Sequence, residues 1–391
     1  MKVTSKFRFC LSLLGFFLIL TNNTLIAQPG GEGIVIGKSF QITSKVFNEE
    51  RTILVYTPEG YRNSDEKYPV LYLLDGYDHF HYVSGMVLSL ARNGKIPNMI
   101  VVGIQNPNRN RDFTPRALPD VPNSGGGNKF IQFAKEELFP FIDKNYRTEP
   151  CRVLMGHSLC GMFAVYSLMK DPELFKGIIA ASPAVYVDKA YLTDFIKKGL
   201  DNNDFGNFLY FTVGGNELPE DIKAIKDFEN LLKESEPEGL KWSFEVLEDK
   251  GHHAVVFMSI YNGLQFIFAD QVITDKLANE DADDIIDHFE KISGLYGYEI
   301  KVPEYLLNNA GYKHLREGNI YDAIKAFEEN ISRYPNSANA YNSLGEAYET
   351  NNQLQLAKEN YEKAYRLASK AGDPNLYLFM QDYENILNKL R

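Results

Sequence analysis

The chain has 391 residues, which is enough for about two domains of roughly 150 residues each. Its apolar content of 44% and charged content of 24% are typical of a soluble globular protein. The net charge of −11 argues against nucleic acid or an anionic membrane as the main partner, and no basic run offsets it.

Residues 1–27 have the pattern of a cleavable signal peptide. They contain three basic residues, no acidic residue and an apolar run of 12 residues, Phe9 to Leu20, which is short for a bilayer span. Residues 25–27 resemble a cleavage site, so we expect the mature chain to begin at Gln28 and to be exported, into the periplasm. A retained membrane anchor is the alternative. No later apolar stretch is long enough to span a membrane.

Cleavage at this site would leave two cysteines, Cys151 and Cys160. They lie at opposite ends of a predicted strand and its turn, too far apart for a disulfide. We therefore expect an exported protein that is stabilised by its core and not by a disulfide framework.

The first half of the chain predicts the edge and centre of a sheet. Residues 33–57 alternate apolar and polar side chains, which favours two or three antiparallel edge strands. Val70–Leu74 and Met99–Val102 are apolar runs typical of buried strands. Residues 105–128 form a long polar loop whose glycine run, Gly125 to Gly127, we interpret as a flexible rim over a cleft, with a solvated surface loop as the alternative.

The second half alternates strands with helices. Strands are predicted at residues 177–181, 209–213 and 242–246, and helices at residues 130–146, 189–198, 221–232 and 255–269. This alternation predicts an α/β fold with a mostly parallel sheet and helices on both faces.

One strand and the helix after it meet at a serine. Val153, Leu154 and Met155 form a short buried strand, Ser158 stands at a sharp turn, and an apolar helical face begins at Met162. A serine on such a turn projects its hydroxyl from the sheet, and the helix N-terminus offers N–H groups to an oxyanion.

The turn predicts the nucleophile elbow of an α/β-hydrolase. Cys160 replaces the second glycine of the usual Gly-x-Ser-x-Gly pattern, and cysteine is small enough to fit there. The alternative is an ordinary connection with a solvent-facing serine.

A serine nucleophile needs a base and an acid that orients the base. In α/β-hydrolases these follow in the order serine, acid, histidine. Glu217 follows a strand after Ser158, and His252 follows the last strand. His253 is adjacent, and we prefer His252.

The acid is the least defined member of the set. Asp221 and Asp249 compete with Glu217, whose alternative role is that of an acid near a helix N-terminus. The oxyanion hole would use the backbone N–H groups of Leu159 and Tyr77.

No metal or other cofactor is expected, because the remaining histidines lack metal-ligand spacing. His157 stands beside the serine, and we expect it to pack beneath the site. We also keep His157 among the candidates for substrate binding.

Five segments together resemble the putative esterase family of α/β-hydrolases. They are residues 72–76, 111–115, 156–161, 182–183 and 252–268, so the resemblance covers about residues 35–270. That family holds enterochelin-type siderophore esterases, feruloyl and acetyl esterases, S-formylglutathione hydrolases and related mycolyl transferases.

The resemblance implies an α/β-hydrolase with Ser158 as nucleophile and His252 as base, and with Tyr77 and Leu159 at the oxyanion hole. The glycine that the family has at position 160 is the one departure, which concerns the fine geometry of the elbow.

The resemblance also bears on the acid and on the substrate. Residues 216–218 resemble the acid-bearing segment of the transferases, which supports Glu217, although siderophore esterases of the family also work with a Ser-His pair. The loop with Arg111 and Asp112 is expected to line the pocket, with Arg111 contacting a carboxylate or phenolate.

Residues 301–391 repeat with a period of 34: Gly311 matches Gly345, Ala323 matches Ala357, and Phe327 matches Tyr361. The pattern resembles tetratricopeptide repeats. A final helix, Leu376 to Leu390, is expected to cap them, and a helix over Ile285–Ile292 to dock them on the hydrolase.

We therefore predict four parts: a signal peptide at residues 1–27, a hydrolase domain at 28–275, a linker helix region at 276–300 and repeats at 301–391. The repeats would bind a protein partner or another copy of the chain, with a structural appendage as the alternative.

The sequence as a whole predicts an exported serine hydrolase that cleaves a carboxylic ester through an acyl-enzyme. A siderophore, a carbohydrate acyl ester or a simple carboxylic ester would fit as the small-molecule substrate. An acyltransferase with the same residues is one alternative, and an inactive adaptor that binds a protein through its repeats is another.

Overall fold

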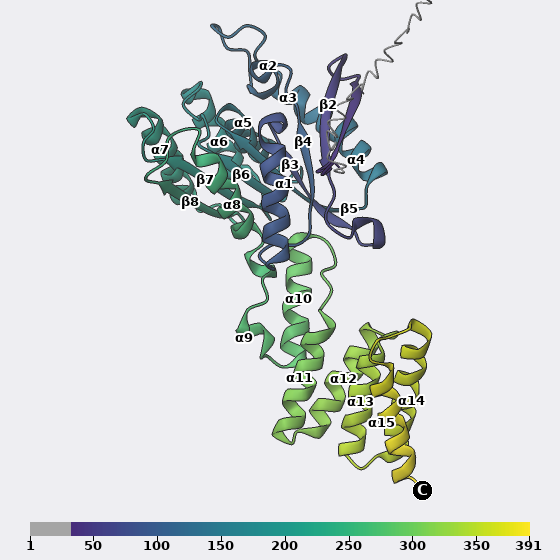
Figure 1. Ribbon diagram of the computed structural model, residues 1–391. Helices are drawn as coiled ribbons and strands as arrows, with labels where there is room; N and C mark the ends of the chain where they lie inside the picture. The colour runs from purple at the N-terminus through teal and green to yellow at the C-terminus, as the bar shows by residue number, and fades with distance from the viewer. Residues whose placement is uncertain (1–32) are drawn as a thin grey trace, which may run out of the picture. The chain divides into compact units, whose positions relative to one another are not determined.

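Eight strands form one sheet in the order β1-β2-β4-β3-β5-β6-β7-β8 in the computed structural model, which describes residues 33–391 (Figure 1). β1 and β2 run antiparallel at one edge, and the other six strands are mutually parallel. The prediction of an α/β fold with a mostly parallel sheet is confirmed. The strands are β1 (Lys38–Ser44), β2 (Glu49–Tyr56), β3 (Tyr68–Leu73), β4 (Ile100–Ile104), β5 (Thr148–His157), β6 (Gly177–Ala181), β7 (Phe208–Gly214) and β8 (Lys241–Leu247).

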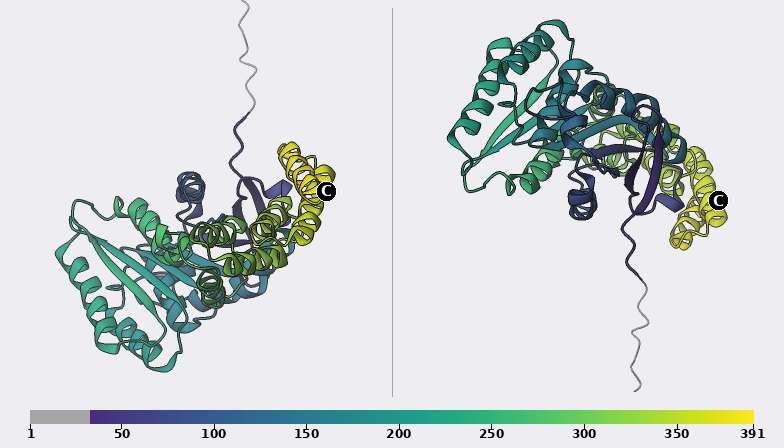
Figure 2. Two further views of the ribbon diagram at one scale, coloured as in Figure 1. Left: turned by 90° about the horizontal axis from the view of Figure 1, so that it is seen from below. Right: turned by 90° about the horizontal axis from the view of Figure 1, so that it is seen from above.

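Helices cover both faces of this sheet, as the two views of Figure 2 show. The helices within and next to the sheet region are α1 (Gly76–Arg92), α2 (Arg109–Phe113), α3 (Gly127–Phe133), α4 (Phe139–Asn145), α5 (Leu159–Lys170), α6 (Lys189–Asn202), α7 (Pro219–Ser235), α8 (Val255–Ile267), α9 (Asp275–Ala278) and α10 (Ala282–Tyr296). The C-terminal helices are α11 (Glu304–Glu317), α12 (Ile320–Arg333), α13 (Ala338–Thr350), α14 (Leu354–Ala371) and α15 (Leu376–Lys389).

The central strands are apolar on both faces because each face carries its own core. Leu71 and Leu73 of β3 pack into a core with α1 and α8. Val70 and Tyr72 of the same strand pack into a second core with α3 to α7. Successive side chains of a strand point to opposite faces, so a doubly covered strand reads as a continuous apolar run.

The helix predicted over residues 130–146 is divided into α3, a π-helical turn (Ala134–Leu138) and α4. Pro140 lies at the start of α4. Proline has no N–H to donate to the preceding turn, and its ring crowds the carbonyl four residues earlier. The helix predicted over residues 130–146 is therefore present, with a π-helical turn inside it.

The long loop at residues 105–128 contains α2 and is held to itself by backbone contacts. The N–H of Gly126 donates to the carbonyl of Arg111 at 2.7 Å, and a Cβ on Gly126 would lie 2.5 Å from that oxygen. A Cβ on Gly125 would lie 2.4 Å from the nitrogen of Ala117. Close backbone packing therefore accounts for glycine at these positions, and the flexible rim stays a prediction.

Within residues 33–391, Cys151 and Cys160 are buried free thiols, and no helix has both the length and the apolar character that a bilayer span requires. The predicted signal peptide, residues 1–27, lies outside the described residues.

α10 packs on the sheet region through a buried apolar face made by Ile285, Phe289, Ile292 and Tyr296. The hydroxyl of Tyr296 donates to the carbonyl of Ile267 at 2.6 Å. Its ring stacks on Phe208 and on Phe268, with ring centroids 5.6 Å apart in each pair. Phe208 begins β7, so α10 lies at the amino end of that strand, away from the carboxyl end where α/β enzymes carry their sites.

The C-terminal helices form two hairpins, α11 with α12 and α13 with α14. The same kind of close contact, between a glycine and an aromatic ring, occurs inside each hairpin. A Cβ on Gly311 would lie 2.4 Å from the ring of Phe327, and a Cβ on Gly345 would lie 2.8 Å from the ring of Tyr361. Each glycine lets an aromatic ring of the next helix approach its backbone. This contact explains why the sequence repeats at these positions.

We predict that Tyr296→Ala lowers the free energy of unfolding by about 3 to 5 kcal/mol, because it removes a stacked ring from the core. Urea unfolding followed by circular dichroism measures the change. Tyr305→Ala is the matched control, since Tyr305 is 50% exposed and its loss should have little effect. Equal effects of the two changes would contradict the role given to Tyr296.

Candidate active site

Ser158 occupies the turn between β5 and α5 in a strained backbone conformation. Its φ of 57° and ψ of −117° are rare for a residue with a side chain. A Cβ on Gly156 would lie 2.2 Å from the carbonyl oxygen of Cys160, so only glycine fits two residues before the serine. A Cβ on Gly161 would lie 3.1 Å from the Cα of Pro183. The crowding falls on positions 156 and 161, which explains why a cysteine is tolerated at position 160.

The Cys160 side chain points into the protein. Its Sγ lies 3.2 Å from Oδ2 of Asp75 and 3.7 Å from Nη2 of Arg109. Burial, followed by the charge of Asp75, raises the pKa of the thiol well above its ordinary value. Cys160 is therefore a neutral thiol that donates to Asp75 and has no nucleophilic character.

Glu217 and His252 meet at the carboxyl edge of the sheet, on the loops that follow β7 and β8. Oε2 of Glu217 accepts a hydrogen bond from Nδ1 of His252 at 2.6 Å. Oε1 of Glu217 accepts from the N–H of Gly214 at 2.7 Å. The Glu217 side chain is 1% exposed and that of His252 is 29% exposed. Both carboxylate oxygens are thus occupied, which fixes the direction in which the imidazole points.

The other two acids do not reach His252 by a hydrogen bond in the described part of the chain. Asp249 pairs with Lys250 at 2.8 Å and is 81% exposed. Asp221, at the start of α7, acts on His252 only as a nearby charge. Glu217 is the acid that the structure brings to the histidine.

The two groups shift each other's proton affinity. The hydrogen bond to Glu217 raises the pKa of His252 above its ordinary value, and partial burial opposes this change. Burial acts to raise the pKa of Glu217, but the hydrogen bonds from His252, Ser182 and Gly214 outweigh it and lower that pKa. Glu217 is therefore an ionised carboxylate at neutral pH.

Ser158 and His252 line one pocket with a volume of about 560 Å³. No hydrogen bond joins Ser158 Oγ to His252 among residues 33–391, and such contacts are often long before a substrate is bound. The other residues that line the pocket are Asp75, Asp78, His79, Tyr82, Arg109, His157, His253, Ala254, Val256 and Phe257.

His157 supports the loop that carries His252. Its Nε2 lies 2.8 Å from the backbone oxygen of His252. A carbonyl only accepts hydrogen bonds, so Nε2 carries the proton. Burial, followed by the nearby His252, lowers the pKa of His157 to about 4, so the ring is neutral. The prediction that His157 packs beside the site agrees with this contact, and the ring also reaches the pocket wall.

Leu159 and Tyr77, the predicted oxyanion donors, both lie in the first turn of a helix. Leu159 begins α5 and Tyr77 is the second residue of α1. N–H groups in a first helical turn have no partner within the helix, so they are free to bind an anion. The Tyr77 side chain is 76% exposed and does not line the pocket.

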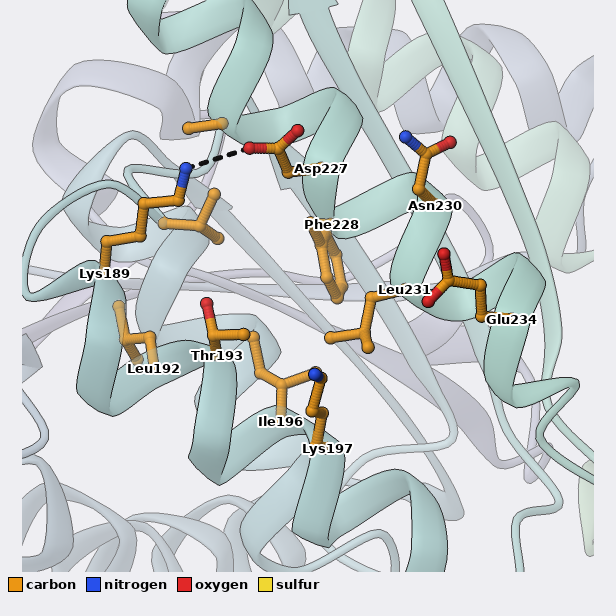
Figure 3. Close-up of a pocket in the computed structure, with 12 residues that line it drawn as sticks. Lys189, Leu192, Thr193, Ile196, Lys197, Asp227, Phe228, Asn230, Leu231 and Glu234 are labelled. Carbon is orange, nitrogen blue, oxygen red and sulfur yellow. Dashed lines mark hydrogen bonds and ion pairs between the residues drawn. The ribbon is translucent and has the colours of Figure 1, made fainter.

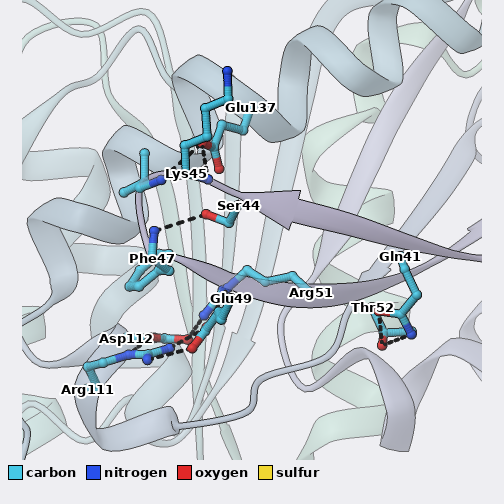
Figure 4. A network of polar contacts seen from close by, with 11 residues as sticks. Gln41, Ser44, Lys45, Phe47, Glu49, Arg51, Thr52, Arg111, Asp112 and Glu137 are labelled. Atoms are coloured by element: carbon cyan, nitrogen blue, oxygen red, sulfur yellow. Dashed lines mark hydrogen bonds and ion pairs between the residues drawn. The ribbon is translucent and has the colours of Figure 1, made fainter.

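Arg111 and Asp112, the predicted substrate contacts, do not reach the pocket. Asp112 is fully buried and pairs with Arg51 and, at 2.7 Å, with Arg111 (Figure 4). Arg111 also binds Glu49 through two hydrogen bonds of 2.6 and 2.8 Å. These side chains fasten α2 to β2, and the predicted contact of Arg111 and Asp112 with substrate finds no support in this arrangement.

Arg51 is the buried centre of that network, and the sequence analysis did not single it out. It is 0% exposed and stacks over the ring of Phe47 at 4.2 Å and the ring of Phe133 at 4.9 Å. The alternating pattern of the strand could have indicated that Arg51 is buried, because Arg51 lies on the same strand face as the buried Ile53 and Val55.

Arg109 is the cation that reaches the pocket. Its Nε lies 2.9 Å from Oδ1 of Asp75, an oxygen that also accepts from Asn106 at 2.7 Å. In the lining of the same pocket, the rings of Tyr82 and Phe257 stack with centroids 5.8 Å apart. Nothing in the sequence paired Tyr82 with Phe257, a side chain so far along the chain.

A second cleft, of about 330 Å³, lies between α6 and α7 (Figure 3). Lys189 and Asp227 form a 2.9 Å ion pair at its edge. Its floor is apolar and includes Leu192, Ile196 and Phe228. Its lining holds no histidine or cysteine, so this cleft is not the candidate active site. Among the described residues, no group of three metal-ligating side chains could hold a metal ion.

We predict that Arg51→Ala lowers the free energy of unfolding by about 3 kcal/mol or more, because it leaves the buried Asp112 carboxylate without one of its two guanidinium partners. Urea unfolding measures the loss. Arg92→Ala is the control, since Arg92 pairs with Glu59 at 2.8 Å in an exposed position and such pairs contribute little. A loss no larger for Arg51 than for Arg92 would show that the network does not stabilise the fold.

We predict that Glu217→Gln lowers the pKa of His252, since the carboxylate that favours the imidazolium is removed. NMR titration of the His252 ring measures the change. Asp221→Asn is the control and should lower the pKa much less, because Asp221 makes no hydrogen bond to the ring. An unchanged His252 pKa in the Gln variant would contradict the observed contact.

Comparison with known proteins shows the family of the chain. A family model described as "Putative esterase" matches residues 44–219. Ferri-bacillibactin esterase BesA of Bacillus subtilis (strain 168) is 31% identical over 230 residues, which cover 51% of this chain and 78% of BesA.

Two solved structures extend the comparison. An IroE-like serine hydrolase from Shewanella oneidensis is 26% identical with a TM-score of 0.66, over 76% of this chain and 99% of that one. An uncharacterised protein from Capnocytophaga ochracea DSM 7271, 19% identical, shares the fold with a TM-score of 0.71 over 90% of this chain and 99% of its own. By its identity to BesA over more than two thirds of that protein, the chain belongs to the putative esterase family and is a carboxylic-ester hydrolase.

Proposed function

We propose that this protein is an exported serine esterase in which Ser158 is the nucleophile, His252 the general base and Glu217 the acid that orients the base. The observation that carries the proposal is the 2.6 Å hydrogen bond between Glu217 and His252 Nδ1, beside the pocket that Ser158 lines. That bond leaves Nε2 of His252 free to take a proton from the serine.

The reaction proceeds in two halves. Ser158 Oγ attacks the ester carbonyl carbon while His252 Nε2 accepts the hydroxyl proton. The tetrahedral intermediate collapses, the alcohol leaves with the proton from His252, and an acyl-enzyme remains. Water then attacks the acyl-enzyme with His252 as base, which releases the carboxylic acid and restores the serine.

The developing negative charge forms on the former carbonyl oxygen. The N–H groups of Leu159 and Tyr77, each in a first helical turn, are the proposed donors to it. Such donors stabilise the tetrahedral state more than the flat ester, and this difference lowers the barrier. Glu217, held ionised by its hydrogen bonds, favours the imidazolium that forms at the same moment.

The proposed substrate is a siderophore ester. The name of BesA, a ferri-bacillibactin esterase, supports this class. The pocket adds a surface that suits an aromatic acyl group, since the stacked rings of Tyr82 and Phe257 supply a flat apolar wall. Hydrolysis assays with a siderophore trilactone, an acylated carbohydrate and a simple carboxylic ester separate these classes. Product analysis with an added alcohol separates a hydrolase from an acyltransferase.

The remaining parts of the chain have proposed roles as well. Residues 1–27 act as a signal peptide for export to the periplasm, and a mature chain that does not begin at Gln28 would contradict this cleavage site. Residues 28–275 form the esterase domain, and residues 276–300 link it to tetratricopeptide-like repeats at 301–391. The matching glycine–aromatic contacts in α11–α12 and α13–α14 support the repeats. Analytical ultracentrifugation tests whether they hold two copies of the chain together.

We predict that a fluorophosphonate probe labels Ser158, forming an Oγ–P bond with loss of fluoride, because the reagent reports an activated serine. Ser158→Ala should take up no label, and the labelling rate of His252→Ala should be lower by at least about 100-fold. Peptide mass spectrometry locates the label.

His288→Ala is the control and should label like the unaltered protein, since His288 lies on α10 and is bonded to the backbone of Asp270. Absence of label on folded protein would favour the adaptor alternative.

A further inference from the structure

One turn of the backbone touches all three proposed catalytic residues. Residues 182–184 follow β6 directly. The Ser182 hydroxyl donates to Oε2 of Glu217 at 2.6 Å and lies 3.2 Å from Nδ1 of His252. The N–H of Ala184 donates to the carbonyl of Ser158 at 3.0 Å. The turn therefore connects the acid and the base through a side chain, and the nucleophile through the backbone.

Ser182 is held in this place against its conformational preference. It is 1% exposed, and its φ of 42° lies in the left-handed region that favours glycine. Its N–H donates to the carbonyl of Thr212 at 3.0 Å, which anchors the turn to β7. Strained residues that the surrounding structure holds in place occur often at functional sites. Glycine would fit this backbone conformation better than serine does. The hydroxyl, which glycine lacks, makes the contacts to Glu217 and His252 and so accounts for serine at this position.

We propose that Ser182 is a positioning residue, whose hydroxyl holds the Glu217 carboxylate against His252 and shares the oxygen that His252 binds. This inference rests on the proposed roles of Ser158, His252 and Glu217. Ser182 itself touches neither substrate nor reacting atoms. Two hydrogen-bond donors fix the direction of a carboxylate oxygen more firmly than one donor does. Each donor also reduces the negative charge that the oxygen presents to the second donor.

The charges around His252 define the sign of the effect. The groups that face its ring are Glu217 after β7, Asp221 on α7, Arg109 on α2, His157 at the end of β5 and the adjacent His253. The Ser182 hydroxyl lowers the pKa of Glu217, because it stabilises the ionised carboxylate. Without the hydroxyl, Oε2 presents more of its charge to Nδ1, which favours the imidazolium and raises the pKa of His252.

The test compares Ser182→Gly and Ser182→Ala with the unaltered protein. Both variants lack the hydroxyl, and glycine also tolerates the positive φ, so the Gly variant is expected to fold without strain. The acid limb of the kcat/KM profile with p-nitrophenyl acetate should move to higher pH by roughly 0.5 in both. We expect kcat to fall about tenfold with KM nearly unchanged, since the hydroxyl acts on the base and not on the substrate.

Thr212→Val is the matched control, because its buried hydroxyl lies on β7 and bonds Ser259 Oγ at 2.6 Å without touching the proposed catalytic groups. It should leave the pH profile unchanged. NMR titration of the His252 ring provides a second measurement that needs no catalysis and should show the same upward change in pKa in both Ser182 variants.

A Ser182→Gly protein with the kcat and the His252 pKa of the unaltered protein would overturn the inference. A different result would overturn the proposed function alone. In that result, Ser158→Ala would retain full hydrolysis while the Ser182 variants still shifted the His252 titration. A Gly variant that shifts the titration but an Ala variant that unfolds supports the inference, since only strain differs between them.

Discussion

The hydrogen bond between Glu217 and His252 depends on the pairing of two strands that are distant in sequence. β7 and β8 are parallel neighbours in register, with Gly214 opposite Leu247. The loops that leave their carboxyl ends therefore start side by side, and one delivers the acid and the other the histidine. β5 ends on the same edge and delivers Ser158. A shift of register on either side of β7 would separate the acid from the base, so the sheet is the physical basis of the site.

Much of this arrangement follows from patterns that the sequence shows directly. Apolar runs such as Val70–Leu74 predict buried parallel strands, and alternation with helices predicts their order. Parallel strands end on one edge, so Ser158, Glu217 and His252, each just past a strand, are expected to converge. The Gly-x-Ser pattern marks the elbow in the sequence, and the structure gives the reason for Gly156, because the approach of the Cys160 carbonyl leaves no space for a side chain.

The remaining features depend on contacts that no local pattern encodes. Arg109 and Arg111 stand two residues apart in one loop, yet the first reaches the pocket and the second is fastened to Glu49. The short helix α2 decides which of them lines the pocket. The role of Ser182 depends likewise on three strands meeting, since its partners lie 35 and 70 residues further along the chain. Length and composition say nothing about such pairings.

The central claim is that the acyl group of the substrate is bound covalently to Ser158 during the reaction. Mixing the mature protein with a p-nitrophenyl ester, quenching in acid within milliseconds and mapping the peptides by mass spectrometry tests it most directly. The account predicts that the acyl mass is found on the peptide that contains Ser158, and that it disappears as the slower hydrolysis step is allowed to finish. Ester turnover without an acyl group on Ser158, or with the group on another residue, would contradict it.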